Sequence, residues 1–600
     1  MLDKKKEVLL ISDDEILSTN NLVWNNKISH DENISITNFI EDNSDDIKQE
    51  YLNLVNDIEN IEYKDKKLFN HFLLQKSFSF FWTTDFYEKS VYKNPKIINQ
   101  LKLIAVKKII EKIKPKEVKI ELNSLEDSKS IFNLCNMLKI KSSIRKNYSF
   151  KNVILNHFFV KVLFSFLKFL RFVWVRFSTK KINFNLIKEK NNLFFTYSAY
   201  SDFNKINKGI FNSIYWNPLL NKKILRNQDN IWCNIFFEQK NSSINFQIRS
   251  FQNINNKNYN FFIEQLFDFK IFFNIIFNWF KNVFKIFFIR KNLKKYLKER
   301  NYNYLENFIE KDFVNSFIGI EAFSSYYYFF LIEKLSKKIF KIKNVFYLFE
   351  NQGWEKSLIY NFYSKSNLIA INHATIRYWD LRFNFHLNGN NKYLPNFYAA
   401  NSDDSFKKLL KENFPISKII KLEALRFFDL AQKISKNKIV SKSSNKILIV
   451  SDFSDKSNNS IIEVMKNIDK TLLSKLNFTL KEHPLKKLNI PDNFKIEKND
   501  DSLIELKKNH NLAIVSNTTS AITDLIMLGY HVIALLDKNT VNLSPLRGSK
   551  KINFIKDFTR ISDIIEHTFN KANYNNDDAN QFFYYNKDLN LWKKILNNDT

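Results

Sequence analysis

Four hydroxyl side chains crowd a turn between an apolar strand and a helix, where a phosphate group could bind. The strand is predicted to end at Val515, and the helix is predicted to run from about Ala521 to Leu528, with Gly529 as its stop. The hydroxyls belong to Ser516, Thr518, Thr519 and Ser520. Hydroxyls and free amides at a helix N-terminus bind anions, whereas an ordinary N-cap needs one hydroxyl. Four hydroxyls therefore favour a phosphate site over a simple cap.

A histidine follows another predicted strand. The strand covers residues 478–482, and His483 and Pro484 come directly after it. A histidine at the carboxyl end of a strand can contact a donor phosphate or protonate a leaving group, although a lone histidine is more often structural. Because parallel strands end at the same edge of a sheet, this histidine and the hydroxyl-rich turn should lie together. That common edge favours the functional interpretation of both.

Carboxylates, a histidine and an arginine follow two further predicted strands. Glu350 ends one strand and Glu355 begins the next helix, while His373 ends the following strand with Arg377 after it. Such a set can supply a general base and contacts to sugar hydroxyls or phosphates. The structural alternative is that Glu355 caps its helix and that Arg377 pairs with Asp380.

Several common catalytic motifs are absent from the sequence. It contains no Walker A, GxGxxG, HExxH or GxSxG motif and no Cys/His spacing typical of a metal site, which weakens kinase, dehydrogenase, metalloprotease and hydrolase interpretations; that neither a metal nor a cofactor is needed is implied by the resemblance described below. The two cysteines, Cys135 and Cys233, are too few for a disulfide scaffold, which indicates a reducing compartment. The basic start is followed by a four-residue apolar run, Val8 to Ile11, too short for a signal peptide, so secretion is not expected.

These side chains must be positioned by parallel strands that alternate with helices. Strands are predicted at 193–200, 231–237, 344–350 and 367–373, and four more follow at similar spacing in the last third of the chain. This alternation predicts an α/β protein with two doubly wound, Rossmann-like sheets, whose ligand site lies at the carboxyl ends of the strands. Three domains and a linker are expected: a small α/β N-terminal domain at 1–145, a Rossmann-like domain at 146–431, a polar linker at 432–446 and a second Rossmann-like domain at 447–600.

The composition is strongly basic and poor in glycine. The formal net charge is +31, and 6 glycines stand in 600 residues, a pattern that codon bias toward AT-rich codons produces. Part of the charge is then compositional; attraction to anionic lipids or to phosphorylated substrates is the functional alternative. Nucleic acid is not expected as a partner, because zinc-finger and RNP-type motifs and long Lys/Arg runs are absent. A glycine retained in such a chain, such as Gly353, indicates a backbone requirement.

Two apolar segments, 157–177 and 268–291, are interrupted by lysines and arginines. A spanning helix needs about 18 or more apolar residues with few charges, so spanning is not expected. In the second segment a stripe of lysine and asparagine lies on one side of the helix, opposite Phe, Trp and Ile. Two interpretations stay open: helices that lie in a membrane interface, and core helices with solvated lysine faces.

Several runs resemble a known family. ENQGWEKSLI, NHATIRYWDLRF, LPNFYAANSDDSFKKLL and KLEALRF resemble bacterial surface carbohydrate biosynthesis proteins of O-antigen and capsule clusters, as do YSAYSD, KGIFNSIYWNPL and FSFFWTTDFYEKS. The runs KEHP and SNTTSA resemble the donor half of GT-B glycosyltransferases, notably sialyl- and Kdo-transferases. The resemblance implies a GT-B-like pair of domains facing a cleft. One departure is Glu482, which stands where the usual KPHP motif has its first proline.

The resemblance also implies a function and roles for single residues. It implies a metal-independent glycosyltransferase of surface polysaccharide biosynthesis, with a nucleotide-sugar donor, such as a CMP-sugar, and a glycan or lipid-linked acceptor. The enzyme would be cytoplasmic and peripheral on the inner face of the membrane. A non-catalytic membrane-associated scaffold and a GT-B-like UDP-sugar epimerase are the alternatives. The implied donor phosphate ligands are His483, Pro484, Ser516, Thr518, Thr519 and Ser520; the implied acceptor bases are Glu350, Glu355 and Asp202; the implied cleft residues are His373, Arg377 and Gln352.

Overall fold

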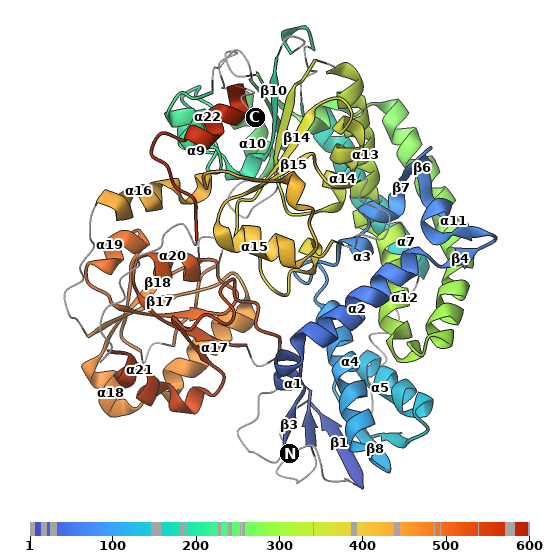
Figure 1. The fold of residues 1–600 in the computed structure, drawn as a ribbon, viewed down its shortest axis with the longest axis vertical. Helices are drawn as coiled ribbons and strands as arrows, with labels where there is room; N and C mark the ends of the chain where they lie inside the picture. Colours follow the sequence, from blue (N-terminus) through green and yellow to red (C-terminus); the bar gives the residue numbers. More distant parts are fainter. Residues whose placement is uncertain are drawn as a thin grey trace.

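Three parallel sheets follow one another along the chain (Figure 1). In each sheet the first strand lies in the interior. The next strands along the chain are added outward on one side of it, and the later strands are added outward on its other side. This doubly wound order confirms the predicted α/β fold, with two Rossmann-like sheets after a smaller N-terminal one. The structure is a computed structural model and describes residues 7–13, 21–24, 33–145, 158–179, 182, 184–187, 190–225, 230–237, 243–252, 254, 259–339, 341–385, 393–436, 445–483, 486–491, 494–537, 539–569 and 582–597.

The N-terminal sheet has the order β3-β2-β1-β8-β9. Its strands are β1 (Val8–Ser12), β2 (Asn21–Val23), β3 (Ile34–Ser35), β8 (Glu117–Glu121) and β9 (Lys141–Ile144). Its main helices are α1 (Ile36–Asp42), α2 (Ser44–Glu59), α4 (Lys96–Ile113) and α5 (Leu125–Met137). Between α2 and α4 the chain leaves this unit and packs η2 (Phe80–Thr83) and α3 (Asp85–Glu88) against helices of the middle unit.

The middle sheet has the order β12-β11-β10-β13-β14-β15-β16. Its strands are β10 (Asn192–Tyr197), β11 (Asn230–Ile235), β12 (Tyr259–Phe262), β13 (Asn344–Leu348), β14 (Asn367–Ile371), β15 (Phe397–Ala400) and β16 (Ile419–Lys421). The helices that the argument below uses are α7 (Phe158–Phe177), α8 (Phe203–Ile206), α11 (Phe269–Glu299), α12 (Glu306–Ile318), α13 (Ile320–Lys338) and α14 (Gly353–Phe362).

The third sheet has the order β19-β18-β17-β20-β21-β22. Its strands are β17 (Lys446–Val450), β18 (Asn477–Lys481), β19 (Ile496–Lys498), β20 (Leu512–Ser516), β21 (His531–Leu535) and β22 (Ile552–Ile555). Helices α17 (Asp455–Asn467) and α21 (Ile561–Phe569) cover one face, and α20 (Ala521–Met527) covers the other.

Burial on both faces explains the continuous apolar strands of the sequence. In β17, Ile447 and Ile449 belong to the core under α17 and α21, whereas Leu448 and Val450 belong to the core under α20. Because successive side chains of a strand point to opposite faces, a strand covered on both sides must be apolar at every position. Each such strand ends where polar residues begin, and this places the polar residues at one edge of the sheet.

The chain returns to the middle unit at its end. Helix α22 (Asn590–Asn597) packs beside the middle sheet, where Trp592 contacts the rings of Trp216 and Phe346 (Figure 1). The predicted third domain, 447–600, thus contains a terminal helix that belongs spatially to its neighbour. Of the predicted linker, residues 432–436 form the end of α16 (Phe428–Lys436), and residues 437–444 lie outside the described ranges.

The three units meet around one carboxylate. Glu41 of α1 accepts hydrogen bonds from Arg547 Nε at 2.8 Å and from Asn542 N at 2.6 Å, both in the third unit. The same carboxylate accepts a bond from Trp379 Nε1 of the middle unit at 3.2 Å. The N-terminal unit therefore contacts both Rossmann-like units at the place where they approach each other.

Candidate functional site

The carboxyl edge of the third sheet carries a buried network of hydroxyls and carboxylates. Asp452 follows β17, and its Oδ2 accepts hydrogen bonds from Ser516 Oγ and, at 2.5 Å, from Thr518 Oγ1. Ser457 Oγ lies 3.3 Å from Thr518 Oγ1 and donates to Asp537 Oδ2 at 3.0 Å. The hydroxyls of Ser516 and Thr518 are thus oriented by a carboxylate. A phosphate could take their hydrogen bonds only by replacing Asp452, whose charge would repel it.

The other residues predicted to bind phosphate lie around this network. Thr519 Oγ1 accepts a hydrogen bond from Ala521 N at 3.3 Å, as an N-terminal cap does, and Ser520 Oγ accepts one from Arg426 Nη2 at 3.4 Å. His483 follows β18, and burial lowers its pKa against the opposing effect of the Asp452 charge, so its imidazole is neutral at pH 7. Pro484 lies outside the described residues.

A carboxylate and a histidine pair at the facing edge of the middle sheet. Glu350 follows β13, and its Oε1 lies 3.3 Å from Nε2 of His373, which follows the neighbouring strand β14. Arg382 Nη1 lies 3.4 Å from Glu350 Oε2. Burial would raise the pKa of Glu350, but the His373 hydrogen bond and the positive charge of Arg382 oppose it and hold that pKa well below its usual value. Glu350 is therefore ionised.

Glu355 and Gln352 support the loop that carries Glu350. The Glu355 side chain has no exposed surface, and its two oxygens accept hydrogen bonds at 3.0 Å from the backbone amides of Glu350 and Asn351. Burial raises the pKa of Glu355 to about 8. Gln352 Nε2 donates to Glu350 Oε2 at 2.5 Å. Glu355 lies beneath the loop, whereas Glu350 lies at the sheet edge with His373.

Arg377 joins the two edges. Its Nη1 donates to the carbonyl oxygen of Thr518 at 2.8 Å and to that of Leu543 at 3.2 Å, both in the third unit. Since Arg377 follows His373 by four residues, the loop after β14 lies against the loop after β20. Asp380 does not pair with Arg377 here: it binds Arg382, with Nη2 to Oδ2 at 2.7 Å.

A cavity of about 470 Å³ lies beside Arg426, which contacts Ser520 of the third unit; Glu350, His373 and Arg377 are not among its lining residues. Asp202, after β10, and Arg426 are among its lining residues. Asp202 caps α8 by accepting a hydrogen bond from Lys205 N at 3.3 Å. Cavities of about 300–1,000 Å³ hold small organic ligands, so this one has room for a sugar or a nucleotide. No group of three or more His, Cys, Asp or Glu residues able to hold a metal occurs within the described ranges.

Asp452, Asp537, Arg382 and Arg426 are site residues that the sequence motifs did not identify. Asp452 carried a usable signal, because it stands directly after the apolar run of β17, as His483 does after β18. Asp537 carried a similar signal, because it follows the apolar run of β21. Arg382 and Arg426 stand in short 3-10 helices, and only the folded chain brings them to the edges. The prediction that the phosphate motifs share one edge is consistent with the adjacency of β18, β17 and β20.

No protein-family model and no curated protein matches the chain. Solved structures similar to it include the UDP-GlcNAc 2-epimerase from Methanocaldococcus jannaschii, with 13% identity, a TM-score of 0.37, and coverage of 68% of this chain and 99% of that chain. The UDP-GlcNAc 2-epimerase from Neisseria meningitidis bound to UDP-GlcNAc has 14% identity, a TM-score of 0.34, and coverage of 68% and 99%. HepE from Anabaena in complex with UDP and glucose has 10% identity, a TM-score of 0.33, and coverage of 64% and 90%. Because these TM-scores are below 0.5, the fold assignment rests on the strand orders of the two larger sheets.

Proposed function

We propose that this protein is a glycosyltransferase of cell-surface polysaccharide assembly, which moves a sugar from a nucleotide-sugar donor, such as a CMP-sugar, to a glycan or lipid-linked acceptor without a metal. The observation that carries the proposal is the meeting of two parallel-sheet edges through Arg377, with the Glu350–His373 pair on one edge and the Asp452 network on the other. Ligands of doubly wound sheets bind at such edges.

The residues divide into two roles in this proposal. With Nε2 donating to Glu350, His373 Nδ1 is free to accept the proton of an acceptor hydroxyl, and this atom has no hydrogen-bond partner among the described residues. Arg426 belongs to the middle unit, but it contacts Ser520 of the other edge and lines the 470 Å³ cavity, so its positive charge is available to a departing phosphate. Together they supply a base and a cation for displacement at the anomeric carbon.

Nucleotide binding tests the proposal. We expect one of CMP, UDP and GDP, or its sugar conjugate, to raise the thermal unfolding temperature, because a ligand at a hundred times its Kd adds about 2.7 kcal/mol of stability. His483→Ala should reduce the shift, whereas His567→Ala, at an exposed position of α21, should leave it unchanged. The absence of any shift in the folded protein would support a scaffold. Conversion of a free UDP-sugar without an acceptor would support an epimerase.

The proposal includes a membrane-facing surface, formed by α7 and α11. By length and composition alone α11 could cross a membrane, but Ile275, Trp279 and Ile286 are buried on its inner side, which packs on α12 and α13. The two helices meet where Phe169 stacks on Phe272 at 5.8 Å. Their outward apolar side chains are 44–74% exposed and form what we name the α7–α11 surface: Leu163, Phe164, Leu167, Leu170, Trp174, Phe177, Phe269, Phe273, Phe277, Phe280, Phe284, Phe287 and Phe288.

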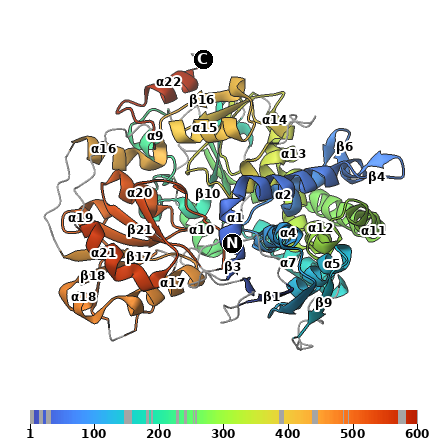
Figure 2. The same ribbon diagram turned by 60° about the horizontal axis from the view of Figure 1, so that its bottom comes forward.

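The charge of the two helices indicates what covers this surface. Residues 158–177 and 269–298 contain four and eight Lys/Arg residues and no Asp or Glu. A second copy of the chain would bring one basic surface against another, which is unfavourable, whereas anionic lipid attracts the lysines and buries the phenylalanines. We therefore propose the headgroup region of an anionic membrane as the partner. α11 lies at the outer side of the molecule in both views (Figures 1 and 2).

Vesicle sedimentation tests this surface. The triple variant Phe273→Ser, Phe277→Ser and Phe284→Ser should bind phosphatidylglycerol-containing vesicles at least about tenfold more weakly than the wild type, because each buried phenylalanine contributes roughly 1.5–3 kcal/mol. Ile416→Ser, at a position 64% exposed on another part of the middle unit, is the matched control and should bind normally. Equal binding by the triple variant, or a wild-type dimer that the triple variant abolishes, would contradict the proposal.

A further inference from the structure

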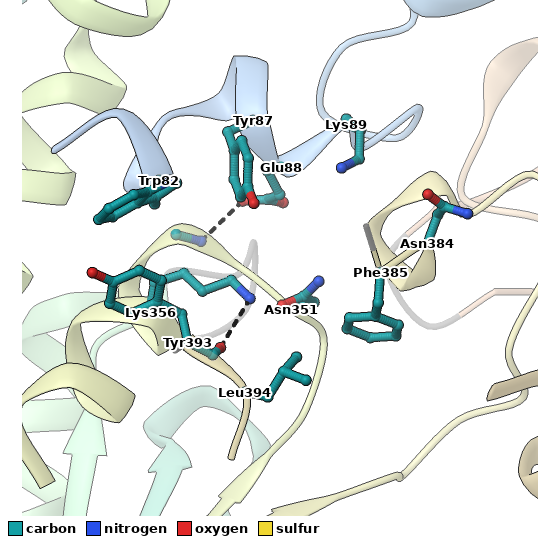
Figure 3. A pocket seen from close by; sticks show the side chains of 11 residues that line it. Trp82, Tyr87, Glu88, Lys89, Asn351, Lys356, Asn384, Phe385, Tyr393 and Leu394 are labelled. Atoms are coloured by element: carbon teal, nitrogen blue, oxygen red, sulfur yellow. Dashed lines mark hydrogen bonds between the residues drawn. The ribbon is translucent and has the colours of Figure 1, made fainter. Parts of the chain in front are cut away.

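A small polar cavity lies between the N-terminal unit and the middle unit, apart from the sheet edges described above. Its volume is about 40 Å³. One side is formed by η2, α3 and the residue after α3, and the other by the start of α14 and the loops beside it (Figure 3). Its lining residues are Trp82, Tyr87, Glu88, Lys89, Asn351, Gly353, Lys356, Asn384, Phe385, Tyr393 and Leu394.

Two buried lysines direct their ammonium groups toward this cavity (Figure 3). Lys89 is 5% exposed and Lys356 is 7% exposed. Within the described part of the chain, Lys89 Nζ has no hydrogen-bond or ion-pair partner and lies 5.0 Å from the centre of the Tyr87 ring. Lys356 Nζ has one hydrogen bond, to the carbonyl oxygen of Tyr393 at 3.4 Å.

The nearby carboxylates have other hydrogen-bond or ion-pair partners, and Glu88 in addition keeps one oxygen, Oε1, unpaired among the described residues. Glu88 Oε2 accepts from Lys93 Nζ at 2.8 Å and from Gly353 N at 3.2 Å. Glu412 pairs with Lys48 and accepts from Asn384 Nδ2 at 2.8 Å. Glu355 has its pKa raised to about 8 by burial, which leaves it largely neutral at pH 7. The charges of Glu59 and Glu412 favour the charged form of Lys89, and those of Glu355 and Glu88 favour that of Lys356, but among the described residues no carboxylate forms an ion pair with either ammonium group.

An uncompensated buried cation is costly, and two close together are more so. Burial lowers the pKa of Lys89 to about 8 and that of Lys356 to about 8, and the charge of Lys89 further disfavours the charged form of Lys356. Both side chains are nevertheless still mostly protonated at pH 7. An anion in the cavity would remove this cost, because it would accept hydrogen bonds from both ammonium groups.

The volume of the cavity and the polar atoms that line it without a partner indicate which anion would fit. One water molecule needs roughly 10–15 Å³ of such a cavity volume, so the cavity of about 40 Å³ holds a group of a few atoms and not a sugar ring. Glu88 Oε1 and Asn351 Oδ1 have no hydrogen-bond partner among the described residues and can accept a bond from a hydroxyl. Hydrogen phosphate and the end of a phosphate monoester combine negative charge with a hydroxyl.

We propose that Lys89 and Lys356 form a binding site for a small oxyanion, in particular a phosphate group, at the contact between the N-terminal and middle units. Gly353 helps to make the site, because it lets the start of α14 approach η2: a Cβ on Gly353 would lie 2.2 Å from the carbonyl oxygen of Thr83. The segments FSFFWTTDFYEKS and ENQGWEKS, far apart in the sequence, meet at this site. The site is independent of the proposed transferase activity and gives the N-terminal unit a ligand-binding role.

Calorimetric titration with inorganic phosphate at pH 7 and constant ionic strength tests the site. We expect saturable binding by the wild type and at least about tenfold weaker binding by Lys89→Met and by Lys356→Met. Lys507→Met is the matched control: Lys507 is buried in the third unit, its pKa is lowered to about 8, and its Nζ donates to the carbonyl oxygen of Gly529 at 2.9 Å. The control should bind phosphate as the wild type does. Equal binding by all variants, or none by the wild type, would overturn the proposal.

Unfolding midpoints without phosphate provide a second readout. If the two lysines form an anion site, Lys89→Met and Lys356→Met should be at least as stable as the wild type without phosphate, since each removes a buried charge that has no ion-pair partner. A large loss of stability in both would show that the lysines serve internal ion pairs, and this would also overturn the proposal. Titrations with acetate and with a sugar 1-phosphate then distinguish a free ion from the phosphate end of a larger ligand. Tighter binding of the sugar phosphate than of inorganic phosphate would assign the end of a larger ligand, and equal binding would assign the free ion.

Discussion

Replacing His373 with alanine is expected to lower the rate of sugar transfer by about 10²–10⁴-fold, the usual contribution of a positioned general base. The imidazole is held by Glu350 at 3.3 Å, and its Nδ1 is the atom left to take a proton. Nucleotide binding should persist, because His373 lies on the middle sheet while the proposed donor contacts Ser520 and His483 belong to the third unit. The measurement is single-turnover transfer with the donor that the thermal-shift series identifies.

The substitution Glu350→Gln separates two effects of Glu350: the orientation of His373 by a hydrogen bond, and the influence of its negative charge on proton transfer. Glutamine keeps an oxygen that can accept the His373 hydrogen bond but removes the negative charge, so we expect a smaller loss of rate and an altered pH profile. A merely structural role of Glu350 would change stability and leave the pH profile unmoved. Full activity of His373→Ala would refute the assigned base and return attention to Asp202, which lines the adjoining cavity.

Gly353→Ala is expected to be the most destabilising single substitution among those considered, at about 3 kcal/mol. The added methyl would meet the backbone of η2, with Thr83 O at 2.2 Å and Thr83 C at 2.9 Å, and neither atom belongs to a side chain that can rotate away. The hydrogen bond from Gly353 N to Glu88 would also be displaced. Urea unfolding followed by tryptophan fluorescence, with Trp82 and Trp354 close to the contact, measures the loss.

Gly548→Ala is the matched control for that substitution. Gly548 has φ +80° and no atom within 4 Å of an added Cβ, so alanine there meets only the cost of a left-handed backbone, about 1 kcal/mol. We expect the Gly353 variant to lose clearly more stability and, in addition, to lose phosphate binding at Lys89 and Lys356. Equal losses in the two variants would show that the close approach of α14 to η2 is readily relaxed.

The strand-helix alternation was sufficient to predict the two Rossmann-like sheets. Apolar runs such as LAIVS and NVFYL are covered on both faces, and each was recognised because no polar residue interrupts it. The edge strands β12, β16, β19 and β22 and the inner strand β15 were not predicted. Their burial patterns are mixed, so their short sequences lack the continuous apolar signal of the central strands.

The candidate site was predictable only in outline. The position of Glu350 and His373 after neighbouring strands follows from the sequence, and so does the adjacency of His483 to the hydroxyl-rich turn. The hydrogen bonds from Ser516 and Thr518 to Asp452 do not follow from the sequence, because they depend on side-chain directions across two strands. The sequence alone therefore identified the hydroxyls but not the Asp452 carboxylate that accepts their hydrogen bonds.

Helix α11 shows a second limit of the sequence pattern. One of the two interpretations left open placed the stripe with Lys270, Lys281 and Lys285 on the solvated side and the apolar side chains in the core; the other placed the helix in a membrane interface. In the structure the phenylalanines point outward and Ile275 and Trp279 point inward, so the lysines flank the apolar row. Lys285 donates to the carbonyl oxygen of His71 in the N-terminal unit, and burial lowers its pKa to about 8. Periodicity reveals the stripes, but packing decides which stripe is buried.

The position of Glu41 has a consequence for how the third unit can move relative to the other two. The third unit is held to the middle unit by Arg377 and to the N-terminal unit by Glu41, which lies on a separate element, α1. Rotation of the third unit away from the middle sheet must therefore break bonds to both other units, one of which carries none of the proposed transfer chemistry. Access of a donor to the cleft then depends on the N-terminal unit, and a substitution at Glu41 would change the rate of opening without touching either sheet edge.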